Sequence, residues 1–262
     1  MVPKATIHLL RIIEICLFMC ISSIMNNAKK VLIFTATYNE AENIESLIDA
    51  IKLNTNKSDI LIIDDNSPDG TSEIIKSKQL SDKNIFLITR NGKLGLDTAH
   101  KEAYEFALKN QYDFLITMDA DLSHDPDEIK FFLVNLESYA FVIGFRYIEG
   151  GKCLMKKKRL LLSKFGNLLM KYLLRIKCNE FTTSYRGFNI KKLQNFNLDM
   201  VKTKGYSFFM GTIYEVAKQK YIIKEIPIIF KDRIKGYSKI PRLEIFRTLK
   251  NLLILSIRNL II

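Results

Sequence analysis

The stretch DFLITMDAD, residues 113–121, indicates the fold class of this chain. Its apolar run ends in two aspartates, Asp119 and Asp121, with one residue between them. A short apolar run bounded by polar residues is typical of a buried strand. We therefore predict a strand over 113–121 that brings two carboxylates to the edge of a sheet.

Three similar runs lie upstream, and each is followed by a helical pattern. The predicted strands are VLIFTATY (31–38), DILIIDD (59–65) and NIFLITR (84–90). The predicted helices cover residues 43–53, 72–78 and 98–110. Strands that alternate with helices predict an α/β fold with a parallel sheet. Because ligands bind beyond the carboxyl ends of such strands, the residues that follow them are candidates for a site.

Composition excludes several classes of protein. The chain has 262 residues, of which 48% are hydrophobic and 26% charged, so it is globular rather than disordered or fibrous. Its four cysteines are Cys16, Cys20, Cys153 and Cys178. They form no CxxC pair and no Cys/His cluster, which argues against a structural zinc site and a disulfide framework and fits a reducing compartment.

Charge is divided unevenly along the chain. Residues 1–150 carry 15 Lys and Arg against 22 Asp and Glu, whereas residues 151–262 carry 25 against 6. A strongly basic half favours contact with phosphate in nucleic acid, at a membrane surface or in an anionic substrate. The basic half has neither a helix-turn-helix nor an RNA-binding aromatic motif, so we do not expect nucleic acid as the partner.

The N-terminus is apolar, and we treat residues 1–29 as an extension that precedes the first strand. Residues 7–25 are long enough to span a membrane, but Arg11 and Glu14 lie inside this stretch. A central arginine costs roughly 2.5–3.5 kcal/mol on insertion. An upstream extension or interfacial helix, a weak single anchor and a signal peptide therefore all remain open.

The acids at the strand ends suit a hard divalent cation. Asp119 and Asp121 can converge once the strand gives way to a loop, and Mg²⁺ or Mn²⁺ is commonly held by such carboxylates together with substrate phosphates. The alternative is a solvated acidic turn. No GxxxxGK[ST] motif and no GxGxxG after the first strand occur, so the expected co-ligand is a nucleoside diphosphate bound in another way.

Six blocks in this order carry a family resemblance. They are TATYNEAENI (35–44), ILIIDDNSPDGT (60–71), RNGKLGLDTAHKEA (90–103), MDADLSHDPDEI (118–129), GFRYIEGG (144–151) and DRIKGYSKI (232–240). Residues 30–242 thus resemble the dolichol-phosphate mannose synthase group of family 2 glycosyltransferases. The resemblance implies a GT-A fold, with a mixed, mainly parallel sheet flanked by helices. It further implies a metal-dependent, inverting transfer of a sugar, typically mannose from GDP-mannose, to a polyprenyl or dolichyl phosphate.

The resemblance also implies roles on the donor side. Tyr38, Glu40 and Asp65 match residues that cradle the nucleoside. Asp119 and Asp121 match the metal-binding pair, Ala120 between them is expected to contact the substrate, and Ser123 can add a metal contact.

On the acceptor side, four basic residues match phosphate-binding positions of the family: Arg146, Arg159, Arg233 and Lys239. Cations placed there can stabilise the nucleoside diphosphate as it leaves. We expect Asp121, Arg146 and Arg233 to be the catalytic residues. Gly236 and Ser238 are expected to keep the loop between Arg233 and Lys239 tight.

Several positions depart from the family pattern. Ala36 stands where proline is usual, Asp97 where glycine is usual, and Gly211 where glutamate is usual. The segment from Glu180 to Arg186 also differs. These changes leave the sugar and the acceptor open, so transfer to a hydroxyl of a glycan or lipid in cell-envelope polysaccharide synthesis is the alternative.

The two acceptors differ in the chemistry that they require. A phosphate acceptor is already anionic and needs no general base, whereas a hydroxyl acceptor needs a nearby carboxylate. Glu180 is the best candidate for that base.

Two basic and apolar segments follow the strand-rich part. Residues 152–177 and 246–258 place apolar side chains at helical spacing beside many Lys and Arg residues. Such a composition is typical of helices that lie in a membrane interface, although a core helix with a solvated basic face is the alternative. We expect residues 243–262 to form a C-terminal amphipathic helix. The cytoplasmic leaflet is anionic, which predicts a protein at the cytoplasmic face of a membrane.

Overall fold

The structure is a computed structural model that describes residues 29–231, except 56 and 156, together with residues 244–261. Nearly all of the expected apolar extension over residues 1–29 lies outside the described residues. The same holds for Arg233, Gly236, Ser238 and Lys239, and for Cys16 and Cys20.

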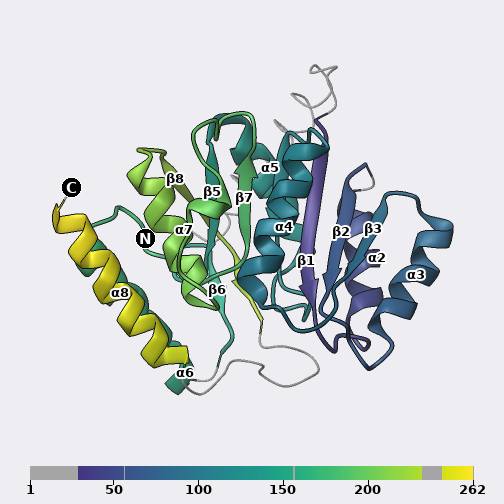
Figure 1. The fold of residues 1–262 in the computed structure, drawn as a ribbon, viewed down its shortest axis with the longest axis horizontal. Coiled ribbons are helices and arrows are strands. Elements are labelled where there is room, and N and C mark those ends of the chain that lie inside the picture. Colours follow the sequence, from purple (N-terminus) through teal and green to yellow (C-terminus); the bar gives the residue numbers. More distant parts are fainter. Residues whose placement is uncertain (1–28, 56, 156, 232–243, 262) are drawn as a thin grey trace, which may run out of the picture.

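A seven-stranded sheet in the order β3-β2-β1-β4-β7-β5-β8 forms the centre of the molecule (Figure 1). Its strands are β1 (Val31–Thr37), β2 (Asp59–Asp64), β3 (Ile85–Thr89), β4 (Phe114–Thr117), β5 (Phe141–Phe145), β7 (Arg186–Asn189) and β8 (Ile223–Pro227). All neighbours pair in parallel except β7, which runs antiparallel to both β4 and β5. The expected mixed, mainly parallel sheet is confirmed.

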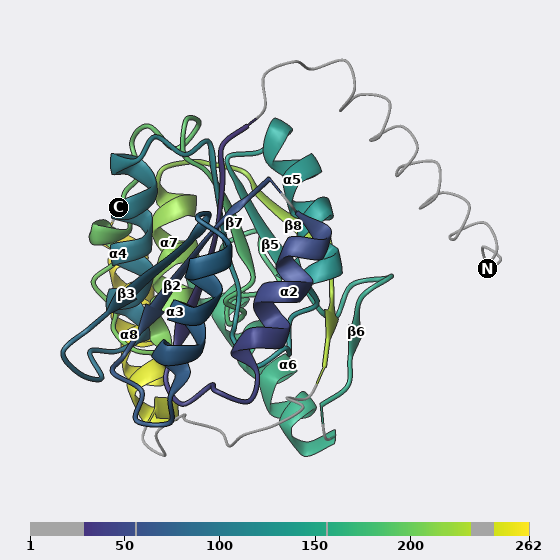
Figure 2. The ribbon, with the colours of Figure 1, turned by 90° about the vertical axis from the view of Figure 1, so that its right-hand side faces the viewer.

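Both faces of this sheet are covered by helices, as the edge-on view shows (Figure 2). One face carries α4 (Leu96–Lys109) and α7 (Ser207–Lys218), and the other carries α2 (Ile44–Asn54) and α5 (Ile129–Ser138). The helix α3 (Thr71–Ser81) lies beside β3. Because both faces are covered, the strands are apolar on both sides and form two cores, one under each layer.

The predicted strands of the acidic half are confirmed, but they end earlier than expected. The strand predicted over 113–121 ends at Thr117. The chain then turns, and Leu122 adopts a left-handed conformation with φ 58°. The turn releases Asp119 and Asp121 from the ladder, so that their carboxylates reach the same side of the sheet edge.

The antiparallel strand β7 depends on a glycine. A Cβ atom at Gly187 would lie 2.9 Å from Leu136 Cδ1, so the missing side chain lets α5 pack directly on the sheet. Next to the main sheet, β6 (Lys152–Cys153) and β9 (Ile229–Phe230) form a small parallel pair. Two short 3₁₀ turns, η1 (Pro126–Glu128) and η2 (Leu198–Met200), complete the described elements.

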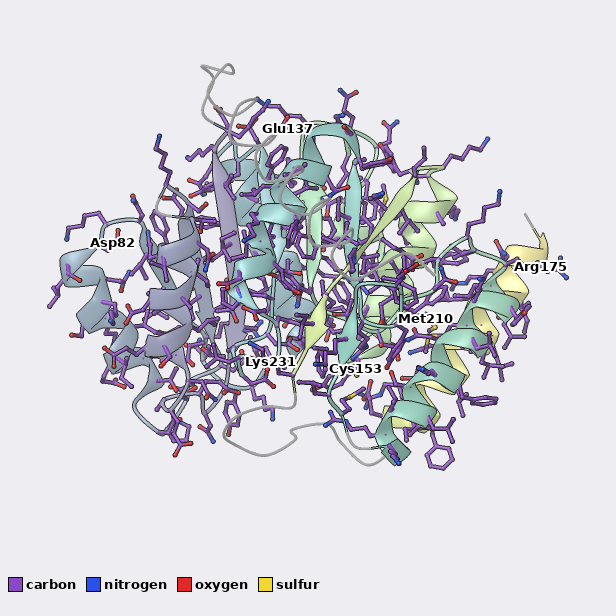
Figure 3. All side chains as sticks on the ribbon, turned by 180° about the vertical axis from the view of Figure 1, so that it is seen from behind. Asp82, Glu137, Cys153, Arg175, Met210 and Lys231 are labelled. Atoms are coloured by element: carbon purple, nitrogen blue, oxygen red, sulfur yellow. The ribbon has the colours of Figure 1, made fainter. Side chains whose placement is uncertain are left out.

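Two long helices, α6 (Lys157–Leu174) and α8 (Glu244–Ile261), lie side by side at one edge of the molecule (Figure 1). They run parallel: Asn259 Nδ2 near the end of α8 donates to the carbonyl of Leu174 at the end of α6, at 2.8 Å. In Figure 3, Arg175 marks that far end of the two helices.

These two helices bury one stripe and expose another. Met170, Leu174, Leu252 and Leu255 are buried in the core. The exposed apolar residues are Leu161, Leu162, Phe165, Leu168, Tyr172 and Leu173 on α6 and Ile245, Phe246, Leu249, Leu253, Ile254 and Ile257 on α8. We call these residues the apolar stripe. Within the described part of the chain, no helix is both long enough and apolar enough to cross a membrane.

Candidate active site

A cleft of about 490 Å³ opens at the carboxyl ends of the strands. Its lining residues come from the loops after β1 to β5, the loop before β7, the start of α7, the strand β9 and the N-terminal parts of α6 and α8. It includes the predicted site residues Tyr38, Glu40, Asp65, Asp119, Ala120, Asp121, Ser123, Arg146 and Arg159. Residues that are separated by more than a hundred positions in the sequence thus share one cavity.

One side of the cleft lies over β1 and β2, where the resemblance implies that the donor binds, and we call it the donor side. Asp65 is ion-paired with Arg90, which also donates to Thr98 Oγ1 and to the carbonyl of Gly95. Burial raises the pKa of Asp65, and the Arg90 guanidinium opposes that effect. Lys93 Nζ lies 4.4 Å from the ring centre of Tyr38. Arg90 therefore holds both Asp65 and the 90–98 loop in place.

The carboxylates of the two aspartates after β4 are oriented by hydroxyl and backbone groups. Ser184 Oγ donates to Asp119 Oδ1 at 2.5 Å, and the Ser123 amide donates to Asp121 Oδ1 at 3.1 Å. Ser123 Oγ is buried and has no hydrogen-bond partner among the residues that the structure describes. Two carboxylates and one unsatisfied hydroxyl are oxygen donors, which fit Mg²⁺ or Mn²⁺ when substrate phosphates complete the coordination.

A buried histidine, His124, contacts the turn after β4. The Asp119 amide donates to His124 Nδ1 at 3.1 Å, and His124 Nε2 lies 3.2 Å from Thr183 Oγ1. Burial lowers the pKa of His124, although Asp119 and Asp121 oppose the shift. With Nδ1 accepting, the neutral ring carries its proton on Nε2 and donates it to Thr183. The imidazole thereby joins the turn after β4 to the loop before β7.

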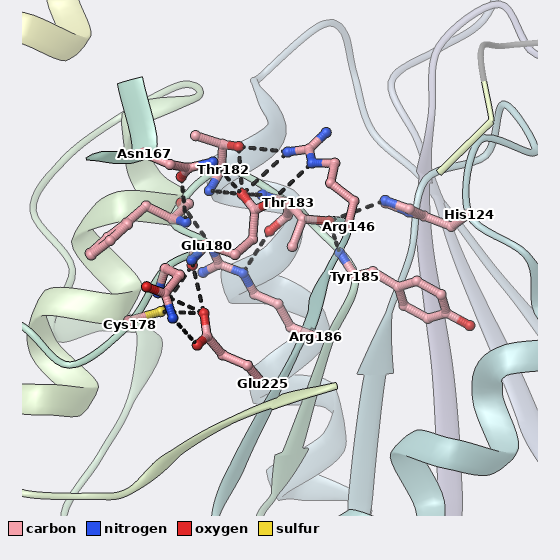
Figure 4. Close-up of polar contacts among 12 residues, drawn as sticks. His124, Arg146, Asn167, Cys178, Glu180, Thr182, Thr183, Tyr185, Arg186 and Glu225 are labelled. Atoms are coloured by element: carbon pink, nitrogen blue, oxygen red, sulfur yellow. Dashed lines mark hydrogen bonds and ion pairs between the residues drawn. The ribbon is translucent and has the colours of Figure 1, made fainter. Parts of the chain in front are cut away.

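Arg146 lines the cleft, but its guanidinium is ion-paired with a buried carboxylate (Figure 4). Its Nε donates to Glu180 Oε2 at 3.0 Å, and its Nη2 donates to Glu180 Oε1 at 3.2 Å and Thr182 Oγ1 at 2.7 Å. The Arg146 side chain is 7% exposed. Much of its hydrogen-bonding capacity is therefore used inside the protein.

Glu180 lies in the wrong place for a general base. Its side chain is fully buried, and it also accepts hydrogen bonds from Asn167 Nδ2 and the Thr182 amide. Burial works to raise the pKa of Glu180, but the ion pair and hydrogen bonds with Arg146 outweigh burial and lower it. The structure thus corrects the expectation for Glu180: it is a structural counter-ion for Arg146.

A second carboxylate fixes the loop that carries Glu180. Glu225 on β8 accepts from the amides of Asn179 and Glu180 at 2.6 and 3.0 Å, and from Asn179 Nδ2 at 2.7 Å (Figure 4). The contacts span about 45 positions in the sequence. Sequence reasoning did not identify Glu225, because nothing in its local pattern marks it.

The other departures from the family pattern have structural explanations. Asp97 Oδ1 accepts from the Gly205 amide at 3.0 Å, so its charge meets a backbone group rather than a cation. A Cβ atom at Gly211 would lie 2.0 Å from Thr203 Oγ1, which leaves no room for a glutamate. Arg186 is buried, but it donates to the carbonyls of Thr183 and Phe181 and forms no ion pair among the described residues.

The N-terminal parts of α6 and α8 complete the other side of the cleft, where the resemblance implies that the acceptor binds, and we call it the acceptor side. Arg159 and Ser163 line the cleft from α6, and Glu244 and Arg247 line it from α8. Sequence reasoning identified Arg159 but treated α8 only as an amphipathic surface. The signal that was available there is an acid and an arginine spaced i,i+3 at the start of the helix.

The chain was compared with families and proteins of known kind. The family described as glycosyl transferase family 2 matches residues 32–196. The undecaprenyl-phosphate mannosyltransferase of Micrococcus luteus is 32% identical over 211 residues, which cover 80% of this chain and 87% of that protein. The polyprenol monophosphomannose synthase of Mycolicibacterium smegmatis is 32% identical over 214 residues, which cover 80% and 81%.

Solved structures agree on the fold. The glucosyl-3-phosphoglycerate synthase of Mycobacterium tuberculosis, solved with Mn²⁺, uridine diphosphate and glucosyl-3-phosphoglycerate, superposes with a TM-score of 0.63 at 14% identity. The match covers 88% of this chain and 80% of that one. The family match, the two relatives and the shared GT-A architecture lead to one conclusion: the chain belongs to glycosyl transferase family 2.

Proposed function

We propose that this chain transfers mannose from GDP-mannose to the phosphate of a polyprenyl lipid, with inversion at the anomeric carbon. The observation that carries the proposal is the 32% identity, over 80% of this chain, to a protein named for mannosyl transfer to undecaprenyl phosphate. A second protein at the same identity is named for polyprenol monophosphomannose synthesis. The cleft supports the proposal because its two sides offer different chemistry.

The donor side suits a nucleoside diphosphate sugar. Tyr38, Glu40 and Asp65 line this side of the cleft and would contact the nucleoside, and Ala120, between the two aspartates of the turn after β4, would contact the substrate. Asp119, Asp121 and Ser123 would hold Mg²⁺ or Mn²⁺. When bound, the ion would neutralise charge on the diphosphate as it leaves.

The reaction requires little proton transfer. An oxygen of the lipid phosphate attacks the anomeric carbon, and the bond from that carbon to the diphosphate oxygen breaks, releasing the nucleoside diphosphate. The attacking oxygen is already anionic, so no base is needed. The burial and ion pairing of Glu180 fit this acceptor better than a hydroxyl, which would need a carboxylate within reach. Arg159, together with Arg233 and Lys239 outside the described residues, would bind phosphate on the acceptor side.

The apolar stripe supports attachment to a membrane surface. Phe165, Tyr172 and Phe246 are 61%, 70% and 70% exposed, and basic residues flank the same helices. Aromatic and aliphatic side chains beside Lys and Arg favour the interface of an anionic leaflet such as the cytoplasmic one. A polyprenyl chain would then remain in the bilayer while its phosphate enters the cleft.

A panel of nucleotide sugars tests the proposal. Each is incubated with polyprenyl phosphate in detergent, with Mg²⁺, with Mn²⁺ or with excess chelator. We expect radiolabel from GDP-mannose to appear in a mild-acid-labile lipid phosphate, and none with chelator. Transfer only to a hydroxyl-bearing glycan or lipid would contradict the proposal.

A further inference from the structure

Three arginines that line the cleft each pair with a carboxylate, but they differ in exposure. The side chains of Arg90 and Arg146 are 6% and 7% exposed, whereas that of Arg247 is 55% exposed. Their partners Asp65, Glu180 and Glu244 are all sheltered, with side chains 10%, 0% and 4% exposed. The ion pair with a sheltered carboxylate thus leaves the guanidinium groups of Arg90 and Arg146 mostly buried, whereas that of Arg247 remains accessible from the cleft.

Glu244 is firmly anchored at the first residue of α8. Its Oε1 accepts from the Tyr206 amide at 2.9 Å, and its Oε2 accepts from Arg247 Nη1 at 2.9 Å. The preceding amide, that of Gly205, donates to Asp97 at the start of α4. Two carboxylates from different helices therefore hold consecutive amides of one turn.

Close packing around this turn limits where Arg247 can lie. Gly205 has φ +61°, and a Cβ atom there would lie 2.9 Å from Glu244 Oε1 and 3.2 Å from Arg247 Nη1. The Arg247 guanidinium thus lies next to the backbone of Gly205, where no side chain intervenes. An arginine fixed in this way loses little conformational entropy when a ligand binds.

The position of Arg247 along α8 indicates which ligand it meets. It lies in the first turn, at the cleft, while Leu249, Leu253 and Ile257 of the apolar stripe continue along the helix away from the cleft. An amphiphile whose chain follows that stripe would place its charged head at Arg247. Guanidinium groups bind phosphate through paired, fork-like hydrogen bonds that an ammonium cannot make.

We propose that Arg247 is a further acceptor-binding residue, which contacts the phosphate of the lipid acceptor and is positioned for that contact by Glu244. This inference rests on the proposed function of the cleft. It makes α8 part of the binding site as well as part of the surface that faces the membrane.

The test compares three variants in neutral detergent, where attraction to an anionic bilayer is absent. Arg247→Ala, Arg247→Lys and Arg258→Ala are assayed for the KM of polyprenyl phosphate, and the Kd of GDP is measured by calorimetry. Arg258→Ala removes the same charge from the far end of the same helix. Melting temperatures show that each variant is folded, as expected for exposed positions.

We expect Arg247→Ala to raise the acceptor KM about tenfold, as for a lost charge-assisted hydrogen bond, while the Kd of GDP stays unchanged. Arg247→Lys should recover part of the loss. The effect of Arg258→Ala should be several times smaller. An acceptor KM in Arg247→Ala equal to that of Arg258→Ala, or an equal loss of GDP affinity, would overturn the assignment.

A failure of the proposed function can be distinguished from a failure of the assignment of Arg247. If the wild-type chain does not transfer sugar to polyprenyl phosphate at all, the proposed acceptor is wrong, but the binding role of Arg247 can still be tested. Binding of a short-chain prenyl phosphate by calorimetry then decides the role of Arg247. Weaker binding to Arg247→Ala than to the wild type supports it, and equal or absent binding contradicts it.

Discussion

The two sides of the cleft are built differently. On the donor side, Asp65, Asp119 and Asp121 follow closely on the ends of β2 and β4, so the order of the strands brings them to one cleft. Contacts with Arg90, Ser184 and the Ser123 amide then orient their carboxylates. On the acceptor side, Arg146 and Arg247 are each held by a carboxylate from a loop or helix start. Carboxylates at strand ends are therefore placed by topology, whereas the arginines are placed by their counter-ions.

This difference is tested most strongly at Asp119 and Asp121, the pair proposed to bind the metal ion. We expect Asp121→Asn to reduce turnover by about 10³-fold or more, since several kcal/mol of charge stabilisation would be lost. The melting temperature should change little because the carboxylate lies in the cleft. Steady-state rates measure the effect. Full activity in the variant, or in the presence of a chelator, would remove Asp121 from the donor side.

On the acceptor side, a substitution in the ion pair of Arg146 and Glu180 is expected to lower the stability of the folded chain. Glu180→Gln leaves the Arg146 charge buried without its counter-ion, so we expect a loss of about 3–5 kcal/mol in the free energy of unfolding. The double variant Arg146→Met/Glu180→Leu removes both charges and should be less destabilised than Glu180→Gln. Urea denaturation compares the three proteins. A Glu180→Gln protein as stable as the wild type would show that the pair is not structural.

Arg233 tests whether the acceptor side also acts on the reaction. If it stabilises charge on phosphate, Arg233→Ala should slow transfer by about 10²–10³-fold, and Arg233→Lys should recover only part of the rate. Melting temperatures serve as the folding control. A transfer rate near that of the wild type in Arg233→Ala would leave Arg159 and Arg247 as the relevant cations.

The smallest predicted effect concerns a buried histidine that lies between α4 and α7. His100 on α4 packs against Phe208 and Phe209 of α7, and burial lowers its pKa to about 3. The unfolded chain binds a proton near pH 6.5 and the folded chain does not, so stability is retained above pH 6.5 and lost as the pH falls towards 3. We expect a loss of about 2 kcal/mol between pH 6.5 and 5 from this residue.

A neutral replacement provides the control for that titration. His100→Leu should remove this part of the pH dependence, which denaturation curves at both pH values would detect. An unchanged slope in the variant would assign the effect to other groups.

The donor side was predictable from the sequence because local patterns determine it. Apolar runs followed by acids located β1, β2 and β4 and the residues Tyr38, Asp65 and Asp119. The acceptor side was harder to predict from the sequence, because its contacts join distant residues. Arg146 pairs with Glu180, 34 positions away, and the Glu180 amide donates to Glu225, 45 positions further on. The start of α8 was predicted as a surface, since helical periodicity cannot reveal that Glu244 bonds to the turn at Tyr206.

The central claim is that the acceptor atom is a phosphate oxygen. It is tested most directly by offering the wild-type chain GDP-mannose with either polyprenyl phosphate or the polyprenol of the same length, in the same detergent. Our account predicts mannosyl transfer to the phosphate and none to the alcohol. The carboxylates that the structure describes on the acceptor side, Glu180 and Glu244, are buried, and each is ion-paired with an arginine, so neither is free to activate a hydroxyl. Transfer to the polyprenol at a comparable rate would contradict it.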